Sequence, residues 1–484
     1  MFTQTRIISA IIAANDFSEK QFFEHEIARW KGSEGRKNQI IGDEYYKGMH
    51  DVLKRKRTVI GPDGRLQEAK NLPNNKIVDN QYAKMVDQKT NYLLGTPFTY
   101  QTSEKEYHAA LGGIFDRKFK RTLQNIGEDS LNGGIAWLYI YCNEDGKLDF
   151  RRFAPYEVLP YWADDEHTIL ECLIRVYEVP AYDGPKYRPI ERVEIYREDR
   201  VEYYLLLDGE LKADSENPTE PYLTSTDEDG NMETHEWGKI PIVAFKYNNE
   251  ETPLICKVKS LQDAINATLS DFQNNMQEDS RNTILVIKNY DGENLGEFRH
   301  NLATYGAVKV RAMEGENGGV DALQVKVNAE NYRTILEILK RAMVENAMGF
   351  DAKDLRSSTP NQMNIQSMYS DVDLDANGME TELQASFEAL LWFVNLYLSG
   401  AGNGNFADTT VEITFKRDIM MNEADEIDNI RNSLGFVSIE TLVSRHPYVT
   451  NAEAELKKLE KERQEEIKEY RGPLPLQEDE NENT

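Results

Sequence analysis

Residues 260–280 read SLQDAINATLSDFQNNMQEDS and contain neither lysine nor arginine, although the whole chain of 484 residues has 56 of them. Apolar residues in and just before this stretch recur at alternating spacings of three and four: Val258, Leu261, Ile265, Thr268 or Leu269, Phe272 and Met276. Such spacing places them on one narrow stripe of an α-helix, while amides, hydroxyls and a few acids fill the other positions. The pattern predicts a long helix with one side packed against protein and the other side in water.

A second helix of the same kind is predicted over residues 329–349, AENYRTILEILKRAMVENAMG. Its inward stripe is predicted to consist of Tyr332, Ile335, Leu339 and Met343. Between the two helices, residues 283–328 contain three stretches that alternate like strands, TILVIK, AVKVRA and LQVKVN. Two narrow-striped helices therefore enclose a strand-rich insert.

The first half of the chain changes from helical to strand-like spacing. Ser18 and Gln21 form a capping-box pattern at the start of a helix. Over residues 134–211 the apolar residues alternate, and two hairpins are predicted, the first of which turns at Asp145-Gly146. Residues 212–238 are acidic and rich in turn formers, so we expect a mobile loop at the rim of a sheet.

The C-terminal part begins with a polar loop, FDAKDLRSSTPNQMN, and continues as a long helix to about Leu398. The apolar stripe of that helix consists of Leu383, Phe387, Leu390, Val394 and Tyr397. TVEITFKRD then returns as a strand, a helical tail follows, and the last residues, PLPLQEDENENT, are expected to be disordered. Long helices combined with antiparallel hairpins predict an α+β fold.

The composition limits what the protein binds. Its net charge is −28, from 56 basic and 84 acidic residues. Non-specific binding of duplex DNA depends on Lys and Arg displacing counterions, so if DNA is a partner of this chain, we expect it to be let past rather than gripped. Its three cysteines form no CxxC motif, which indicates reduced thiols and no zinc site. The apolar run from Ile7 to Ala14 is short and poorly flanked, so we expect no cleaved leader, and no stretch approaches the ~18 apolar residues of a membrane helix.

Motifs for catalysis are missing from the sequence. It contains no GxxxxGK[ST] phosphate loop, no HExxH and no GxSxG. The seven histidines are scattered, with no pair at metal-ligand spacing. We expect no catalytic residue, no bound metal and no cofactor.

One acidic stretch, DVDLDANGMETE at residues 371–382, resembles a calcium loop at first sight. Its sixth residue is Ala376, where a calcium loop needs glycine to turn sharply, so a helix is the preferred interpretation. An alternative from another functional class is a metal-dependent nuclease that uses Asp371, Asp373 and Asp375, because two-metal chemistry employs clustered carboxylates. A further alternative is an adaptor protein.

A family resemblance is carried by seven segments taken in chain order. They are YYKGMHDVLKRKR, NNKIVDNQYAKMVDQKTNYLLGTPFTY, GKIPIVAFKYNNEETPLI, VKSLQDAINATLSDFQNNMQ, MYSDVDLDANGMETELQASFEALLWF, VEITFKRDIMMNEADEID and GFVSIETLVSRHPYVTNAEAELKKLEKE. Together they resemble the portal proteins of long-tailed, siphovirus-type bacteriophages that infect Gram-positive bacteria.

The resemblance implies a homo-oligomeric ring, expected to be a dodecamer, at one vertex of the virion capsid after assembly in the host cytoplasm. Double-stranded DNA would pass through this ring without sequence specificity, during both packaging and ejection. The implied partners are the terminase large subunit, the scaffolding and major capsid proteins, and a head-completion or adaptor protein. No membrane is implied.

The resemblance also implies a division of the chain into named parts. These are a wing at 1–255 with its mobile loop at 212–238, a stem helix at 256–281, a small α/β clip at 282–328, a second stem helix at 329–349, a tunnel loop at 350–364, a long helix at 365–400, a return to the wing at 401–435, a helical crown at 436–471 and a disordered tail at 472–484.

Three sets of candidate functional residues follow from these parts. The stem residues expected to face the channel are Asp263, Asn266, Asp271 and Asn274. Because these positions carry no positive charge, they would keep phosphates out of contact, and repulsion would act over roughly 8 Å at physiological salt. The tunnel-loop residues expected to touch DNA are Lys353, Arg356, Asn361 and Gln362. The clip residues expected to meet terminase, the connector or neighbouring subunits are Lys288, Lys309, Arg311 and Lys326.

Overall fold

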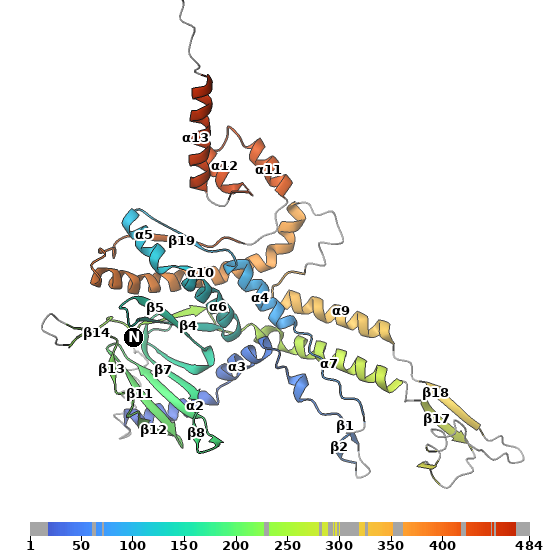
Figure 1. Ribbon diagram of the computed structural model, residues 1–484. Helices are drawn as coiled ribbons and strands as arrows, with labels where there is room; N and C mark the ends of the chain where they lie inside the picture. The colour runs from blue at the N-terminus through green and yellow to red at the C-terminus, as the bar shows by residue number, and fades with distance from the viewer. Residues whose placement is uncertain are drawn as a thin grey trace, which may run out of the picture. The chain divides into compact units, whose positions relative to one another are not determined.

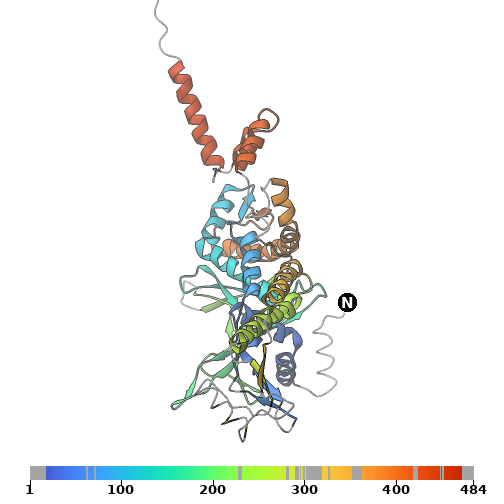
Figure 2. The same cartoon turned by 90° about the vertical axis from the view of Figure 1, so that its right-hand side faces the viewer.

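The computed structural model describes residues 18–60, 64–69, 72–226, 232–279, 283–288, 294, 296–297, 300, 319–324, 328–351, 362–417, 423–446, 448–449 and 452–470. Two compact units make up the chain. The first consists of Met1–Phe350 and Asp371–Asp418, and the second consists of Asp351–Ser370 and Ile419–Thr484. Figures 1 and 2 show the elements of both from two directions.

Long helices form the centre of the first unit. Those that the structure describes are α2 (Glu19–Lys31), α3 (Glu34–Tyr46), α4 (Gln81–Leu94), α5 (Lys105–Ile114), α6 (Arg117–Gly133), α7 (Ile255–Asp279), α9 (Ala329–Asn346) and most of α10 (Gln362–Gly400), with the 3₁₀ turns η1 (Asp51–Lys54) and η2 (Pro155–Glu157). The predicted capping box at the start of α2 is confirmed, because the Ser18 side chain accepts from the Gln21 backbone and Gln21 bonds back to Ser18.

The largest sheet of the first unit is antiparallel and has the order β12-β11-β10-β7-β6, with β13 added at β11. Its strands are β6 (Val158–Trp162), β7 (Leu170–Val179), β10 (Ile190–Tyr196), β11 (Arg200–Leu207), β12 (Glu210–Ala213) and β13 (Glu220–Pro221). A smaller sheet has the order β16-β4-β5, from β4 (Ile135–Cys142), β5 (Leu148–Phe153) and β16 (Ile242–Lys246). β16 and β6 are therefore edge strands.

Paired strands complete the first unit. They are β1 (Thr58–Ile60) with β2 (Leu66–Glu68), β3 (Thr99–Thr102) with β19 (Val411–Thr414), β8 (Tyr182–Asp183) with β9 (Lys186–Tyr187), β14 (Leu223–Thr226) with β15 (Met232–His235), and β17 (Thr283–Lys288) with β18 (Gly319–Gln324). The pairing of β19 with β3 returns the chain to the N-terminal half after α10.

Three apolar clusters hold the first unit together. The largest joins α4, α6, α7, α9 and α10, and includes Phe387 of α10 and Met343 of α9. The second lies between the two sheets around Trp137 and Trp162. The third packs Phe23 and other residues of α2 on the large sheet. The predicted stripe of α10 is confirmed, because Leu383, Phe387, Leu390 and Val394 are buried and Tyr397 packs against the cluster.

The second unit is helical where it is described. It contains α11 (Glu423–Asn432), α12 (Ile439–Arg445), α13 (Ala452–Tyr470) and the first residues of α10. Ser438 caps α12 by accepting from the Thr441 backbone. α12 and α13 agree with the helical tail expected from the sequence.

Most element predictions are confirmed, including the turn at Asp145-Gly146, where Gly146 has a φ of +71°. Two are wrong. The stretch 212–238 is not wholly a loop, because β14 and β15 pair within it, and β-branched residues favour that pairing. Met276 and Ile335, assigned to packed stripes, are each 49% exposed within the single subunit. β18 at Gly319–Gln324 overlaps the start of the predicted strand LQVKVN, of which residues 325–327 lie outside the described part of the chain.

Several predictions concern residues outside the described part of the chain. These are the leader-like run at Ile7–Ala14, the strand AVKVRA, most of the tunnel loop and the tail at 472–484. No helix among the described residues is long and apolar enough to cross a membrane.

Candidate functional site

α7 and α9 form the helix pair expected from the sequence. The Phe272 and Tyr332 rings lie 5.1 Å apart, and the amide of Asn275 donates to the Tyr332 hydroxyl at 2.8 Å. Because Tyr332 begins α9 whereas Phe272 is near the end of α7, the two helices run antiparallel, side by side in Figure 1. The strands β17 and β18 are inserted between them in the chain.

A polar stripe on α7 binds the backbone of an extended segment that precedes α4. Three side chains spaced one turn apart accept hydrogen bonds from main-chain N–H groups of this segment. The pairs are Asn274–Asn75 at 2.7 Å, Ser270–Ile77 at 3.0 Å and Asn266–Asp79 at 3.0 Å. Four helical residues rise about 6 Å and two extended residues span about 6.6 Å, so the two repeats match over these pairs. One turn further along α7, Gln262 accepts from the Tyr82 N–H in the first turn of α4 at 2.9 Å. The side chains of α7 therefore accept the backbone hydrogen bonds that a neighbouring strand would accept in a sheet.

This stripe corrects part of the channel prediction. Asn266 is 0% exposed and Asn274 is 1% exposed, so neither amide faces a water-filled channel. The sequence predicts solvent-exposed amides here because it does not distinguish an amide that is hydrogen-bonded to water from one that is hydrogen-bonded to backbone. The signal that could have found the stripe is its composition, since all four positions are neutral and polar at a strict spacing of four.

Asp263 and Asp271, the two acidic residues of the predicted channel set, remain partly exposed on α7. Asp263 accepts from the Tyr45 hydroxyl at 2.6 Å and pairs with Lys259 at 2.7 Å. Asp271 pairs with Arg55 at 2.9 Å. Their side chains are 34% and 38% exposed, and basic groups of the same chain partly neutralise them.

His50 lies buried beneath this stripe. Its Nδ1 is 2.7 Å from the Asn266 amide nitrogen, and its Nε2 is 3.0 Å from the Tyr45 carbonyl oxygen. The Asp79 N–H fixes the Asn266 oxygen, so the amide nitrogen must donate to Nδ1 and the His50 proton must sit on Nε2. Burial lowers the pKa of His50, which favours this neutral form.

The acidic stretch at 371–375 is helical, as preferred from the sequence. Asp375 pairs with Lys89 at 2.6 Å and accepts from the Tyr247 hydroxyl at 2.8 Å. Asp373 accepts from the Tyr92 hydroxyl at 3.0 Å. Two of the three carboxylates that the nuclease alternative needs around a metal, those of Asp373 and Asp375, are thus bound to side chains of the same protein. Among the described residues, no group of three or more His, Cys, Asp or Glu could hold a metal ion.

Lys89 joins three helices of the first unit. Its ammonium group also donates to the Met348 carbonyl at 3.1 Å, just after α9, so it links α4, α9 and α10. The side chain is 3% exposed. Burial lowers the pKa of Lys89, and the neighbouring Asp375 carboxylate opposes that shift.

The remaining candidate residues lie at or beyond the edge of the described structure. Lys353, Arg356 and Asn361 of the tunnel loop and Lys309, Arg311 and Lys326 of the clip lie outside the described residues. Gln362 is the first residue of α10 and Lys288 is the last of β17, and neither side chain is described.

Residues 34–469 match the family described as phage portal protein, SPP1 Gp6-like. The chain belongs to this family of portal proteins. The portal protein of Bacillus phage SPP1 is 27% identical over 430 residues, covering 87% of this chain and 83% of that protein. The portal protein of Clostridium phage phiCD119 is 24% identical, covering 86% of this chain and 91% of that protein.

Among solved structures, a chain from the neck of an empty gene transfer agent particle covers 74% of this chain and 88% of its own length. It is 13% identical, with a TM-score of 0.38. A chain from the virion of the native gene transfer agent has the same identity and TM-score, and covers 74% of this chain and 87% of its own length. The helices and strands described above form an α+β fold, as predicted from the sequence.

Proposed function

We propose that this portal protein assembles into a closed ring, a dodecamer, at one vertex of the phage capsid, and that double-stranded DNA passes through it during packaging and ejection. Membership of the portal family over residues 34–469 is the observation that carries the proposal. The proposed partners are the terminase large subunit, the scaffolding and major capsid proteins, and a head-completion protein.

In this proposal the parts of the chain keep the roles expected from the sequence. α7 and α9 form the stem, the β17–β18 insert belongs to the clip, residues 350–364 form the tunnel loop, and α12 and α13 form the crown. The acidic side chains Asp263 and Asp271 face the channel. Asn266 and Asn274 are removed from the set of channel-facing residues, because both are buried within the subunit.

The surface of α9 supports contact between subunits. The side chains of Ile335 and Ile338 are apolar, yet they are 49% and 61% exposed in the single subunit. A heterologous interface needs such a surface to meet a different surface of the next subunit, and a ring results when these contacts close. The proposal assigns Ile335 and Ile338 to that interface.

Imaging and native mass spectrometry of the purified protein test the proposal. Wild type and Ile338→Leu should form rings with a central opening. Ile338→Asp, which places a charge in the proposed interface, should shift the population to monomers while its circular dichroism stays that of the wild type. A wild-type protein that remains monomeric across buffers would contradict the proposal, as would compact oligomers without an opening.

A further inference from the structure

A groove of about 720 Å³ in the first unit is used by none of the roles proposed above. Its walls come from the end of β6 with the loop that follows, from β16 with the turn before it, and from one face of α10. Representative residues from these three walls are Trp162, Ala244 and Ser386. The groove therefore exists only after segments far apart in the chain have come together.

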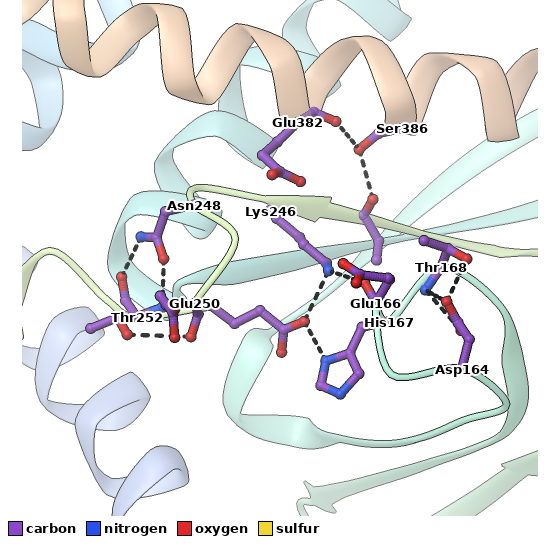
Figure 3. A network of polar contacts seen from close by, with 12 residues as sticks. Asp164, Glu166, His167, Thr168, Lys246, Asn248, Glu250, Thr252, Glu382 and Ser386 are labelled. Carbon is purple, nitrogen blue, oxygen red and sulfur yellow. Dashed lines mark hydrogen bonds and ion pairs between the residues drawn. The ribbon is translucent and has the colours of Figure 1, made fainter. Parts of the chain in front are cut away.

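The loop wall of the groove is held in place by its own hydrogen bonds, as Figure 3 shows. The Asp164 carboxylate accepts from the Thr168 backbone at 3.0 Å and from its hydroxyl at 2.7 Å. His167 contacts Glu251 at 2.7 Å, and Lys246 pairs with the same carboxylate at 3.3 Å. Such a loop is pre-organised, so a ligand would not have to order it.

Strand β16 presents a free edge to the groove. Its register with β4 turns the backbone groups of Ala244 and Lys246 away from that partner. The Ala244 carbonyl accepts from the Ser386 hydroxyl of α10 at 2.8 Å, seen at the top of Figure 3. The N–H groups of Ala244 and Lys246 have no hydrogen-bond partner in the part of the chain that the structure describes. A strand edge with unpaired N–H groups is a template for another extended chain.

The groove is negatively charged, which favours a positively charged ligand. Five carboxylates line it, from Glu166, Glu171, Glu198, Glu382 and Glu388, against Lys239 and Lys246. Lys246 is 8% exposed and already pairs with Glu251. One oxygen of Glu171 is buried without a hydrogen-bond partner among the described residues, which is costly until a donor reaches it.

Apolar side chains flank these carboxylates at the rim. Ile169 is 57% exposed and lines the groove. Trp392 is 37% exposed on α10, beside the groove residue Lys239, whose ammonium group lies 4.5 Å from the indole centroid. A bound segment must therefore carry cationic groups to pair with the carboxylates of the groove and apolar groups to cover the apolar side chains at its rim.

We propose that this groove binds an extended segment of a partner protein in which lysine or arginine alternates with apolar residues. The backbone of the segment adds to the edge of β16. Its basic side chains reach Glu171 and Glu382, and its apolar side chains cover Ile169 and Trp392. Since side chains alternate across an extended chain, one segment can supply both kinds of contact.

Fluorescence anisotropy with a short labelled peptide of alternating valine and lysine tests the proposal on the full-length protein. The wild type should bind this peptide. The double variant Glu171→Gln with Glu382→Gln should bind it roughly tenfold more weakly, a change that corresponds to about 1.4 kcal/mol. Ala389→Trp, which fills the groove from the exposed face of α10 without changing charge, should weaken binding as much.

Matched controls separate the groove from the general acidity of the protein. Glu210→Gln, at the start of β12 on the far edge of the large sheet, should bind like the wild type. A peptide of alternating glycine and lysine carries the same charge without apolar groups and should bind more weakly than the valine peptide. Equal affinity for the two peptides would overturn the proposal, as would equal affinity of the wild type and both groove variants, or no binding to the wild type.

Discussion

At the scale of single residues, Asn266 shows how one buried amide orders its surroundings. Its oxygen accepts from the Asp79 N–H and from Gln262, and its nitrogen donates to His50. All three side-chain bonds are made in a region closed to water, where a lost bond leaves its partner unsatisfied. The residue is therefore more important to the fold than its neutral chemistry suggests.

Replacing Asn266 by leucine, which has a similar volume, should destabilise the protein by about 3 kcal/mol, because a buried N–H and a histidine acceptor lose their partners. The midpoint and slope of urea unfolding measure this loss. Gln273→Leu, on the exposed face of the same helix, is the control and should change stability little. An equal loss in the two variants would show that the stripe is not special.

The neutral state of His50 predicts a pH dependence. An unfolded histidine titrates near a pKa of about 6.5, and burial lowers the pKa of His50, so the unfolded state takes up the proton first. The contribution of His50 is therefore present above about pH 6.5 and is lost as the pH falls, with a slope of at most about 1.4 kcal/mol per pH unit.

Urea unfolding of wild type and His50→Gln between about pH 7.5 and 5.5 measures this contribution. The slope of stability against pH should be shallower in the variant. Gln273→Leu replaces an exposed residue that does not titrate and should leave the slope unchanged. Identical slopes in wild type and His50→Gln would refute the assignment.

At the scale of elements, the long helices are the part of the fold that the sequence predicts best. The sequence predicts helices at 256–281 and 329–349, and the structure has helices at Ile255–Asp279 and Ala329–Asn346. The apolar stripe of α7 is buried at Val258 and Ile265, as predicted. Burial of its polar stripe as well could not be predicted, because that stripe is hydrogen-bonded to a segment whose sequence carries no periodic signal. The exposure of Met276 and Ile335 could not be predicted either. An apolar stripe does not reveal whether the surface that it packs against belongs to the same subunit or to another one.

Lys89 and Asp375 fasten α4, α9 and α10, so breaking the pair should loosen all three. Lys89→Met leaves a buried carboxylate without its cation and should cost about 3–5 kcal/mol, whereas Lys89→Met combined with Asp375→Leu should recover much of that loss. Lys118→Met removes an exposed pair with Asp149 and should cost much less, because water screens it.

A double-mutant cycle followed by urea unfolding measures the coupling between Lys89 and Asp375. Additive losses in the two single variants would mean that the pair does not couple the helices.

At the scale of the whole molecule, the sequence alone predicts the net charge of the protein but not the groove beside β16. Net charge is read directly from composition, and so is the expectation that DNA is not gripped. The groove beside β16 could not be predicted, because Trp162, Lys246 and Ser386 come together only through the fold. The candidate tunnel-loop and clip residues remain predictions, since the structure does not describe their side chains.

The acidic surface predicts that purified protein does not retain duplex DNA at about 0.15 M salt, because few basic groups are available to release counterions. Anisotropy of labelled duplex DNA measures this, with a basic DNA-binding protein as the positive control. Tight binding that weakens steeply with added salt would contradict the prediction.

The contact between α7 and the segment before α4 has an evolutionary consequence. Ser270 accepts from the main chain of Ile77 and not from its side chain, and every amino acid except proline offers the same N–H. Position 77 should therefore drift freely among relatives while position 270 stays restricted to small hydrogen-bonding residues. In a saturation scan, position 77 should tolerate every substitution except proline. Position 270 should tolerate very few.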